Sequence, residues 1–421
     1  MLTAVVGINW GDEGKGRMVD LLSADYDIVC RYQGGNNAGH TVINDYGKIV
    51  LNLLPSGISR EGTVNVMGNG MVIDLEHLVH EIQSLRDKGI HIGPDNLKIS
   101  DKAVICLPWH KMQDIMEEDR LKDKKFGSTR RGIGPVYADK YMKKAIRMGD
   151  LFAPDKLPEK VAELTEWKNL TVRGYGHEPV KAEDILAWLH EFGDPIKPYI
   201  TDVSDYLYDA ATAGENIMFE AQLGALRDIE FGIYPYTSSS CTLAGYATIG
   251  AGIPGLKLDK TIGIMKAYSS CVGEGPFTVE MFGDEAEALR RAGGEYGAAT
   301  GRPRRVGAFD IPASRYGVRM HGADCIALTK MDVLSYMDKI PVCVAYDING
   351  EITEKFPVGE RLNAAKPVFE YMEGFGDISG CRKPEDLPKA AMDYIRYLEA
   401  AVGCKIKYVS VGAGRDEYVE L

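Results

Sequence analysis

Short apolar runs recur along the chain and alternate with segments in which apolar positions repeat at the helical period. Such runs are typical of buried strands, and the helical period is typical of helices that cover a sheet. We predict strands over residues 2–8, 27–32, 48–54, 63–67, 96–100, 216–219, 261–267, 324–328, 340–346 and 406–411. We predict helices over residues 16–24, 74–88, 109–122, 180–192, 201–213, 285–292 and 387–402. This alternation indicates an α/β fold with a mostly parallel central sheet flanked by helices.

The chain has 421 residues, enough for one large α/β domain or two smaller ones. No repeat, low-complexity tract or linker divides it, so we predict a single domain over residues 1–421. Residues 156–198 are the most polar helical stretch and are predicted to be a peripheral helical insertion. Ligands of parallel α/β sheets bind at the carboxyl ends of the strands, where we expect the site.

Composition narrows the class of partner. A net charge of −12 disfavours non-specific binding to nucleic acid, and no apolar run reaches the roughly 18 residues of a membrane span. No secretion signal precedes the first strand, and the eight cysteines form no C-x-x-C pair. We therefore predict a cytoplasmic protein with reduced thiols and with neither a nucleic-acid nor a membrane partner. Anionic substrates would be met by local basic clusters at 122–131, 140–147 and 302–305.

A glycine-rich turn, Trp10-Gly-Asp-Glu-Gly-Lys-Gly16, lies between the first predicted strand and the first predicted helix. That geometry presents backbone N–H groups to a phosphate. The turn is not a standard phosphate loop, because Asn9 stands where glycine is expected and Gly16 where a Ser or Thr would bind Mg²⁺. Asp12 is the candidate metal ligand instead. A carboxylate that faces phosphates implies either a metal or a proton to be moved.

Seven motifs follow one another in the order of a known family. They are the 10–16 turn, Gly34-Gly-Asn-Asn-Ala-Gly-His-Thr41, Thr129-x-Arg131-Gly-Ile-Gly-Pro135, Lys266-Ala-Tyr268, Val272-Gly-x-Gly-Pro-Phe277, Thr300-Gly301-Arg302 and Leu328-Thr-Lys-x-Asp332. Over nearly its whole length the chain resembles adenylosuccinate synthetases, GTP-dependent ligases that join IMP and L-aspartate on the way to AMP. The resemblance implies a P-loop-like GTP-binding architecture, a Mg²⁺ cofactor and a homodimer.

The predicted GTP site joins the phosphate turn to two later loops. Asp332 in Thr329-Lys-Met-Asp332 offers an acceptor-only carboxylate that matches the N1 and N2 donors of guanine, and the Lys330 stem can lie over the base. Lys15 is expected to reach the β- and γ-phosphates, and the resemblance places Mg²⁺ on Asp12 and the Gly39 carbonyl. The predicted GTP residues are Gly11, Asp12, Glu13, Gly14, Lys15, Gly16, Arg17, Gly39, His40, Thr41, Arg304, Lys330, Met331, Asp332, Ser410, Val411 and Gly412.

By resemblance, the IMP residues are Asp12, Glu13, Gly14, Lys15, Asn37, Ala38, Gly39, His40, Thr129, Lys143, Gln222, Thr237 and Arg302. The family reads F-E-G-A-Q-G where this chain reads F-E-A-Q-L-G over residues 219–224. An ungapped comparison puts Leu223 and Ser238 at the two ligand positions. We favour a shifted loop that keeps Gln222 and Thr237 as ligands, and a true loss is the alternative.

The resemblance assigns L-aspartate to a basic loop with Ala298, Ala299, Thr300, Gly301, Arg302 and Arg304, in which Pro303 should stiffen the backbone. Lys143 replaces a family arginine that reaches IMP from the neighbouring subunit, so the bidentate fork is lost. Arg130 stands at a family glycine, and we hypothesise that it restores the weakened phosphate contact. Cys271, where many relatives have arginine, has no explanation in the sequence.

The chemistry that the resemblance implies gives Asp12 and His40 the catalytic roles. Asp12 is the candidate base for N1 of the purine, and His40 the partner that donates to the phosphoryl oxygen. One alternative is a relative that aminates a guanine monophosphate, although such relatives lack the base that Asp12 provides. Another is a guanine-nucleotide switch without ligase activity, which would not need Asp12, His40 and Arg302 together.

Overall fold

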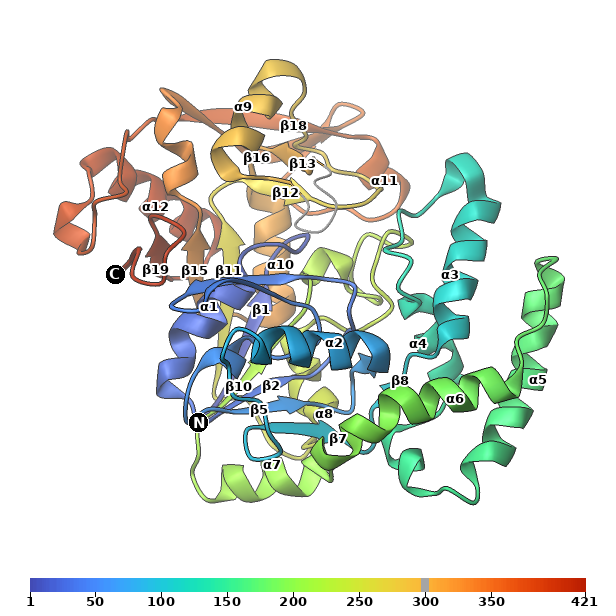
Figure 1. Ribbon diagram of the computed structural model, residues 1–421. Coiled ribbons are helices and arrows are strands. Elements are labelled where there is room, and N and C mark those ends of the chain that lie inside the picture. Colours follow the sequence, from blue (N-terminus) through green and yellow to red (C-terminus); the bar gives the residue numbers. More distant parts are fainter. Residues whose placement is uncertain (297–302) are drawn as a thin grey trace.

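The computed structural model describes residues 1–296 and 303–421, and its centre is a ten-stranded sheet (Figure 1). In spatial order its strands are β20 (Tyr418–Glu420), β19 (Ile406–Ser410), β15 (Cys325–Thr329), β11 (Lys260–Lys266), β1 (Leu2–Gly7), β10 (Ile217–Glu220), β2 (Ile28–Arg31), β5 (Val64–Met67), β7 (Leu97–Ser100) and β9 (Ile200–Thr201). Neighbouring strands are parallel except β19 and β20. The predicted α/β class with a mostly parallel sheet is confirmed.

Helices cover both faces of this sheet, so its strands are apolar on both sides. Val5 of β1 packs with Met18 on one face, whereas Val6 belongs to the cluster of Val203 and Leu207 on the other. The helices are α1 (Lys15–Leu22), α2 (Leu75–Arg86), α3 (Pro108–Leu121), α4 (Ile133–Tyr141), α5 (Leu157–Gly174), α6 (Ala182–Gly193), α7 (Val203–Thr212), α8 (Ala247–Ala251), α9 (Gly283–Gly293), α10 (Ile311–His321), α11 (Glu360–Asn363) and α12 (Lys389–Val402). None of the helices in the described ranges is both long and apolar enough to cross a bilayer.

Two predicted strands lie outside the central sheet. Residues 48–54 contribute β4 (Gly47–Leu51), which forms an antiparallel hairpin with β3 (His40–Asn44). Residues 340–346 lie in β16 (Lys339–Ile348), which pairs antiparallel with β18 (Ala365–Glu373). Alternate residues of β4 are buried and exposed, as in a strand with one solvated face. The apolar pattern alone did not distinguish these strands from those of the parallel sheet.

Short strands complete the smaller sheets around the site. They are β6 (Val72–Ile73) with β8 (Val104–Ile105), β12 (Ser269–Cys271) with β13 (Arg305–Gly307), and β14 (Phe309–Asp310) and β17 (Glu351–Thr353) on β16. Strands β12 and β13 follow the carboxyl end of β11 and bring residues 305–307 beside it.

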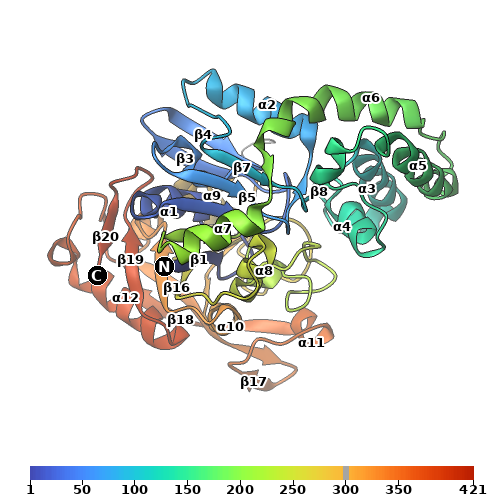
Figure 2. The same cartoon turned by 90° about the horizontal axis from the view of Figure 1, so that it is seen from below.

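Helices α3 to α6 form an arm on one side of the molecule (Figures 1 and 2). The arm includes the predicted 156–198 insertion, and Leu157 and Ile185 share a hydrophobic cluster with Leu75 and Ile99. A buried ion pair, Lys168 Nζ to Asp139 Oδ2 at 2.7 Å, joins α5 to α4. A shared core is what a single domain would have, and the division of the chain remains a prediction.

Candidate nucleotide-binding site

The phosphate turn connects β1 to α1 at the carboxyl end of the sheet, as predicted. Gly11 and Gly14 adopt φ values of 101° and 91°, which favour glycine, and Asp12 adopts φ 59°. The Glu13 carboxylate accepts hydrogen bonds from the backbone N–H groups of Asn9 at 3.1 Å and Gly11 at 2.7 Å. It also pairs with Lys15 Nζ at 2.7 Å, and both side chains are buried. In this structure Glu13 therefore occupies donors that a phosphate could use.

The Asp12 carboxylate is part-exposed at the mouth of the turn and accepts no hydrogen bond from the described residues. Among the described residues it pairs with Arg304, whose Nε lies 3.4 Å from Oδ2. The described ranges hold no group of three or more His, Cys, Asp and Glu side chains that could bind a metal by themselves. Asp12 and the Gly39 carbonyl are oxygen donors of the kind that Mg²⁺ prefers, and substrate phosphates and water usually complete its sphere. The residues present fit that cation.

His40 begins β3 with its ring buried, and its Nδ1 is hydrogen-bonded to Glu220 at the end of β10. Glu220 also accepts from the backbone N–H of Ser56 at 2.8 Å and the Ser56 hydroxyl at 2.5 Å. Burial lowers the pKa of His40, although Glu220 opposes it. Burial alone would raise the pKa of Glu220, but His40 and Arg31 outweigh it and lower that pKa. An ionised Glu220 therefore orients His40 through Nδ1.

Sequence analysis missed Glu220 as a functional residue. The predicted strand 216–219 stopped one residue short, and the observed strand ends at Glu220 itself. A carboxylate at the carboxyl end of an apolar strand is a usable signal, because ligands of parallel sheets bind at that edge. Its partner Ser56 lies far along the sequence, so the contact becomes visible only in the fold.

The predicted guanine loop lies beside the phosphate turn. The hydroxyl of Thr329, at the end of β15, donates to the Glu13 carbonyl at 2.6 Å and ties the two segments together. Asp332 follows, and its Oδ1 is buried without a hydrogen-bond partner among the described residues. Burial raises the pKa of this carboxyl. An unpaired buried acceptor is costly unless a ligand supplies donors, so Asp332 is suited to the N–H groups of a base.

The predicted GTP residues 410–412 lie next to this loop. The Met331 N–H donates to the Ser410 carbonyl at 3.3 Å, which joins the ends of β15 and β19. Arg17, on α1, donates to the Gly414 carbonyl at 2.6 Å, the Glu417 carbonyl at 3.0 Å and the Ser410 hydroxyl. The structure therefore places the 330–332 and 410–412 segments together. Gly16 lies in the same first turn of α1 as Arg17, and Val411 and Gly412 continue from β19.

The loop after β2 carries the next predicted ligands. Asn37 is half-buried, and its Oδ1 accepts from the Gly35 N–H at 3.3 Å. The Ala38 carbonyl accepts from Asn52 Nδ2 at 2.9 Å, which anchors the loop to the end of β4. Gly39 is exposed, and Thr41 is half-buried in β3. This loop leads directly into His40.

Two pairs of residues in the 219–240 region are candidates for the IMP ligands, Gln222 with Thr237 or Leu223 with Ser238, and their side chains have different surroundings. Gln222 is fully buried, and its amide pairs with the Gly35 backbone at 3.2 and 2.8 Å. Leu223 adopts φ 62°. Ser238 Oγ lies 3.3 Å from the Ser240 hydroxyl, whereas the Thr237 hydroxyl has no partner among the described residues. Gln222 thus supports the Gly34–Gly35 backbone here, and Thr237 is free to contact a ligand.

Residues 126–132 form the loop between α3 and α4 that carries Thr129. Asp114 of α3 holds it, accepting from the Ser128 hydroxyl at 2.6 Å and the Gly132 N–H at 2.9 Å. Thr129 is exposed, and no described residue pairs with its hydroxyl. Arg130 has φ 58° and pairs with Asp119 at 2.9 Å on the exposed side of α3. The structure therefore gives Arg130 a partner other than the phosphate of our hypothesis.

Cys271 also has a partner that the sequence did not reveal. Its buried sulfur accepts from Arg227 Nη2 at 3.0 Å, and the same guanidinium donates to the carbonyls of Val272 and Tyr236. Arg227 therefore supplies a buried guanidinium beside a position where relatives carry arginine.

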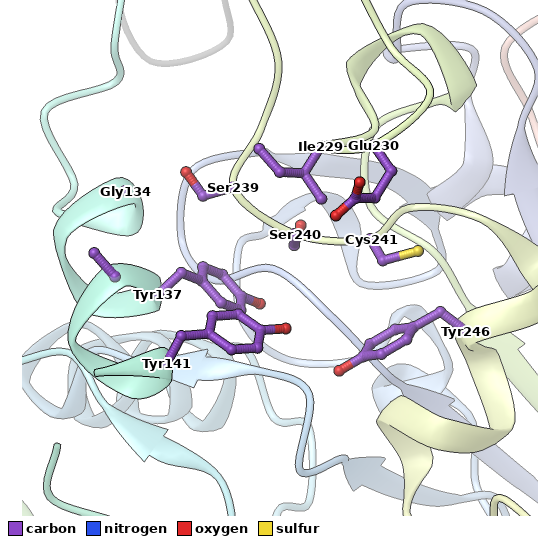
Figure 3. Close-up of a pocket in the computed structure, with 10 residues that line it drawn as sticks. Gly134, Tyr137, Tyr141, Ile229, Glu230, Ser239, Ser240, Cys241 and Tyr246 are labelled. Atoms are coloured by element: carbon purple, nitrogen blue, oxygen red, sulfur yellow. The ribbon is translucent and has the colours of Figure 1, made fainter. Parts of the chain in front are cut away.

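A cavity of about 470 Å³ lies beside the loop after β2. In Figure 3, Tyr137 and Tyr141 of α4 face Tyr246 across it. The Tyr137 hydroxyl accepts from the Gly34 N–H at 2.9 Å, so this wall also supports the loop. Glu230 is the charged lining residue, and none of the residues around the cavity is Lys or Arg. The lining therefore does not suit a phosphate.

Several predicted ligands lie outside the described residues. They are Ala298, Ala299, Thr300, Gly301 and Arg302, which include most of the predicted aspartate loop. The structure describes Arg304, whose Nη1 pairs with Glu295 Oε2 at 2.9 Å.

The phosphate turn and the predicted guanine loop lie together at the carboxyl edge of a parallel sheet. This arrangement is typical of a nucleotide-binding α/β enzyme. The sequence matches the adenylosuccinate synthetase family over residues 4–419. The adenylosuccinate synthetase of Caldanaerobacter subterraneus subsp. tengcongensis is 44% identical over 423 residues, which cover 100% of this chain and 99% of the relative. That of Streptococcus gordonii is 43% identical over 416 residues, which cover 98% and 96%.

Solved structures agree. The fully ligated adenylosuccinate synthetase of Plasmodium falciparum superposes with a TM-score of 0.92 at 36% identity, covering 100% of this chain and 99% of that one. Cyanophage S-2L succinoaminodeoxyadenylate synthetase, bound to dGMP and dATP, gives a TM-score of 0.61 at 18% identity, covering 100% and 95%. The phage likeness shows the fold alone. The chain belongs to the adenylosuccinate synthetase family, and it is a GTP-dependent ligase of purine biosynthesis.

Proposed function

We propose that the enzyme joins IMP to L-aspartate, with GTP converted to GDP and phosphate, and that adenylosuccinate forms through 6-phosphoryl-IMP. The observation that carries this proposal is the Asp12 carboxylate, left without a hydrogen bond from the described residues at the mouth of a phosphate turn. The buried His40–Glu220 pair belongs to the same carboxyl edge of the sheet. A proton acceptor and an oriented imidazole are the groups that this reaction needs.

The 6-oxygen of a purine 6-one is a poor leaving group, so an amine cannot displace it directly. Asp12 takes the N1 proton, so negative charge develops on the 6-oxygen. That oxygen attacks the γ-phosphorus of GTP as GDP departs. A free aspartate has a pKa near 3.9 and is a weak base, so proton removal and attack are concerted. His40 donates from Nε2 to the phosphoryl oxygen as charge shifts. The ionised Glu220 at Nδ1 stabilises the protonated ring that this donation requires. The aspartate amine then displaces phosphate from C6.

Mg²⁺ belongs to this proposal, with Asp12 and the Gly39 carbonyl as its protein ligands. When bound, the cation supplies neutralisation of the charge on the phosphates. Lys15 would exchange its contact with Glu13 for the phosphates, and Asp332 would accept from the guanine N–H groups beside the Lys330 stem. Arg304, whose Nε lies 3.4 Å from Asp12 Oδ2, would contact the ribose.

A homodimer is also part of the proposal. Lys143 is exposed at the end of α4, adopts φ 63° and pairs with no carboxylate in the described ranges. Its neighbours Tyr141 and Met142 are 72% and 59% exposed, which leaves them accessible to a second subunit. We infer that Lys143 reaches the IMP phosphate of the other subunit. A cytoplasmic location fits the eight free thiols.

One specific feature favours a second candidate, the amination of a guanine monophosphate. In an ungapped comparison Leu223 takes the position where the family carries its glutamine ligand, and the Gln222 amide pairs with the Gly35 backbone. The retained Asp12 favours IMP, because the base-lacking relatives use the guanine substrate.

Substrate assays separate these proposals. The enzyme is incubated with GTP, L-aspartate and Mg²⁺ plus either IMP or dGMP, and the purine absorbance is followed. Product from IMP alone is expected. Product from dGMP alone would establish the second candidate, and nucleotide binding without turnover would refute both. Omission of Mg²⁺ with added chelator should abolish turnover.

A further inference from the structure

Glu295 is a fully buried carboxylate that contacts four donors from three segments of the chain. Its Oε1 lies 2.8 Å from Lys266 Nζ and 3.1 Å from Lys330 Nζ, and it accepts from the Tyr268 hydroxyl. Its Oε2 lies 2.9 Å from Arg304 Nη1. The two oxygens thus divide the partners, with the lysine of the guanine loop on one and Arg304 on the other.

The cluster is electrostatically uneven. Burial alone would raise the pKa of Glu295, but Lys266, Lys330 and Arg304 outweigh it and hold that pKa well below its usual range. Glu295 is therefore ionised at neutral pH, and one buried negative charge serves three cations. Removal of that charge would leave a buried ammonium on Lys266 uncompensated, which is far costlier than the loss of a surface pair.

The backbone holds Glu295 in place independently of its side chain. Its N–H donates to the Arg290 carbonyl of α9 at 2.9 Å, and its carbonyl accepts from the Arg304 N–H at 2.9 Å. Tyr296 and Pro303 form a β-bridge, and Arg290 Nε donates to the Arg304 carbonyl at 2.8 Å. The carboxylate therefore stands on a fixed backbone support between α9 and β13.

Lys330 depends on this support for its conformation. It adopts φ 57°, a left-handed value that is unfavourable for an L-residue. Its ammonium donates to the Gly293 carbonyl and to Glu295, so the head of the side chain is anchored away from the guanine-loop backbone. Anchoring both ends of the side chain holds its aliphatic stem in one orientation.

We propose that Glu295 is the positioning residue of the guanosine end of the GTP site, setting the Lys330 stem with one carboxylate oxygen and the Arg304 guanidinium with the other. This inference rests on the GTP site proposed above. Glu295 touches neither base nor ribose itself. One buried charge thus links the Lys330 stem, which is proposed to contact the base, to Arg304 beside Asp12. A change in the position of Glu295 would alter both contacts.

The test compares Glu295→Gln with Glu280→Gln in the full-length enzyme. Glu280 pairs with Arg305, the residue after Arg304, at 2.5 Å, so it controls for loss of a neighbouring carboxylate–arginine pair. Kd values for GDP and for inorganic tripolyphosphate are measured by calorimetry without IMP or aspartate, and melting temperatures report folding. For Glu295→Gln we expect GDP affinity to fall about tenfold, the loss associated with a charged hydrogen bond, with tripolyphosphate affinity unchanged.

A double-mutant cycle measures the coupling between Glu295 and Lys330 in the GDP Kd. A purely structural role of Glu295 would produce no such coupling. If Glu295 acts through Lys330, the effect of Glu295→Gln on the GDP Kd shrinks in a Lys330→Met background. Additive effects, or equal losses for GDP and tripolyphosphate, would overturn the proposal.

A second variant and a measurement on the wild-type enzyme complete the test. If Glu295→Gln does not fold, Tyr268→Phe removes one donor to Oε1 and should weaken GDP binding about threefold, and unchanged binding would then overturn the proposal. If the wild-type enzyme binds GDP but shows no ligase turnover, the proposed reaction is refuted. The GDP and tripolyphosphate Kd values of the variants would still decide the role of Glu295.

Discussion

The two halves of the site are built differently. On the guanine and phosphate side, residues at the ends of β1 and β15 hold one another, as in the Thr329–Glu13 contact and the Lys15–Glu13 pair. On the proposed IMP side, Thr129, Lys143 and Thr237 lie on loops, and their side chains pair with no described residue.

This difference has a physical origin. Strand ends are fixed by hydrogen bonding across the sheet, so side chains that leave them can be preorganised by buried charge pairs. Loop residues lack that support and need the ligand or a second subunit to complete their contacts. Substitutions in the first half should therefore disturb a rigid network of contacts. Substitutions in the second half should mainly change the affinity for IMP.

The largest expected effect tests the rigid half at Asp12. Asp12→Asn keeps the shape but removes the proton acceptor, so kcat should fall on the order of 10³-fold with a nearly unchanged KM for IMP. Purine absorbance at saturating substrates measures this loss. Asp377→Asn, on an exposed loop after β18, is the matched control. A kcat within a few-fold of wild type would exclude Asp12 as the base.

Glu220→Gln tests whether orientation of the imidazole matters as much as its presence. The variant loses the charge that holds His40 Nδ1, and kcat should fall on the order of 10²-fold. Ser56→Ala, which removes only one donor to Glu220, should cost far less. If both variants reduce kcat equally, Glu220 acts as a packing residue and the oriented pair is not part of the mechanism.

Lys143 tests the loop half and the dimer together. Lys143→Ala should raise the KM for IMP about tenfold, as expected for one charged hydrogen bond, and leave the KM for GTP unchanged. Mixing this variant with Asp12→Asn should then restore activity, because hybrid dimers contain one site with both groups intact. No recovery after subunit exchange would mean that Lys143 does not act across an interface.

The smallest expected effect concerns Arg130. Glycine relieves its left-handed backbone, so Arg130→Gly should change the free energy of unfolding by less than about 1 kcal/mol in the stabilising direction. Because Arg130 already pairs with Asp119 on an exposed surface, the KM for IMP should rise no more than about threefold. Denaturant unfolding and steady-state kinetics measure both quantities. A tenfold rise would re-establish Arg130 as a phosphate ligand.

Local pattern was sufficient for much of this protein. Each predicted strand and helix overlaps an observed one, because buried parallel strands and amphipathic helices leave distinct periodicities in the chain. The phosphate turn was also readable, since its glycines are required by positive φ values at Gly11 and Gly14. These features depend on neighbours within a few residues, which the sequence lists in order.

Long-range pairing decided the rest. The sequence did not show that residues 340–346 leave the central sheet, because an apolar run does not name its partner strand. Nor did it reveal that Glu220 holds His40, or that Glu295 joins Lys330 to Arg304. The His40–Glu220 contact joins residues 180 positions apart, and the Lys330–Glu295 contact joins residues 35 positions apart. Buried charges acquire their roles from whichever cations the fold brings within hydrogen-bond distance, and only tertiary packing determines which those are.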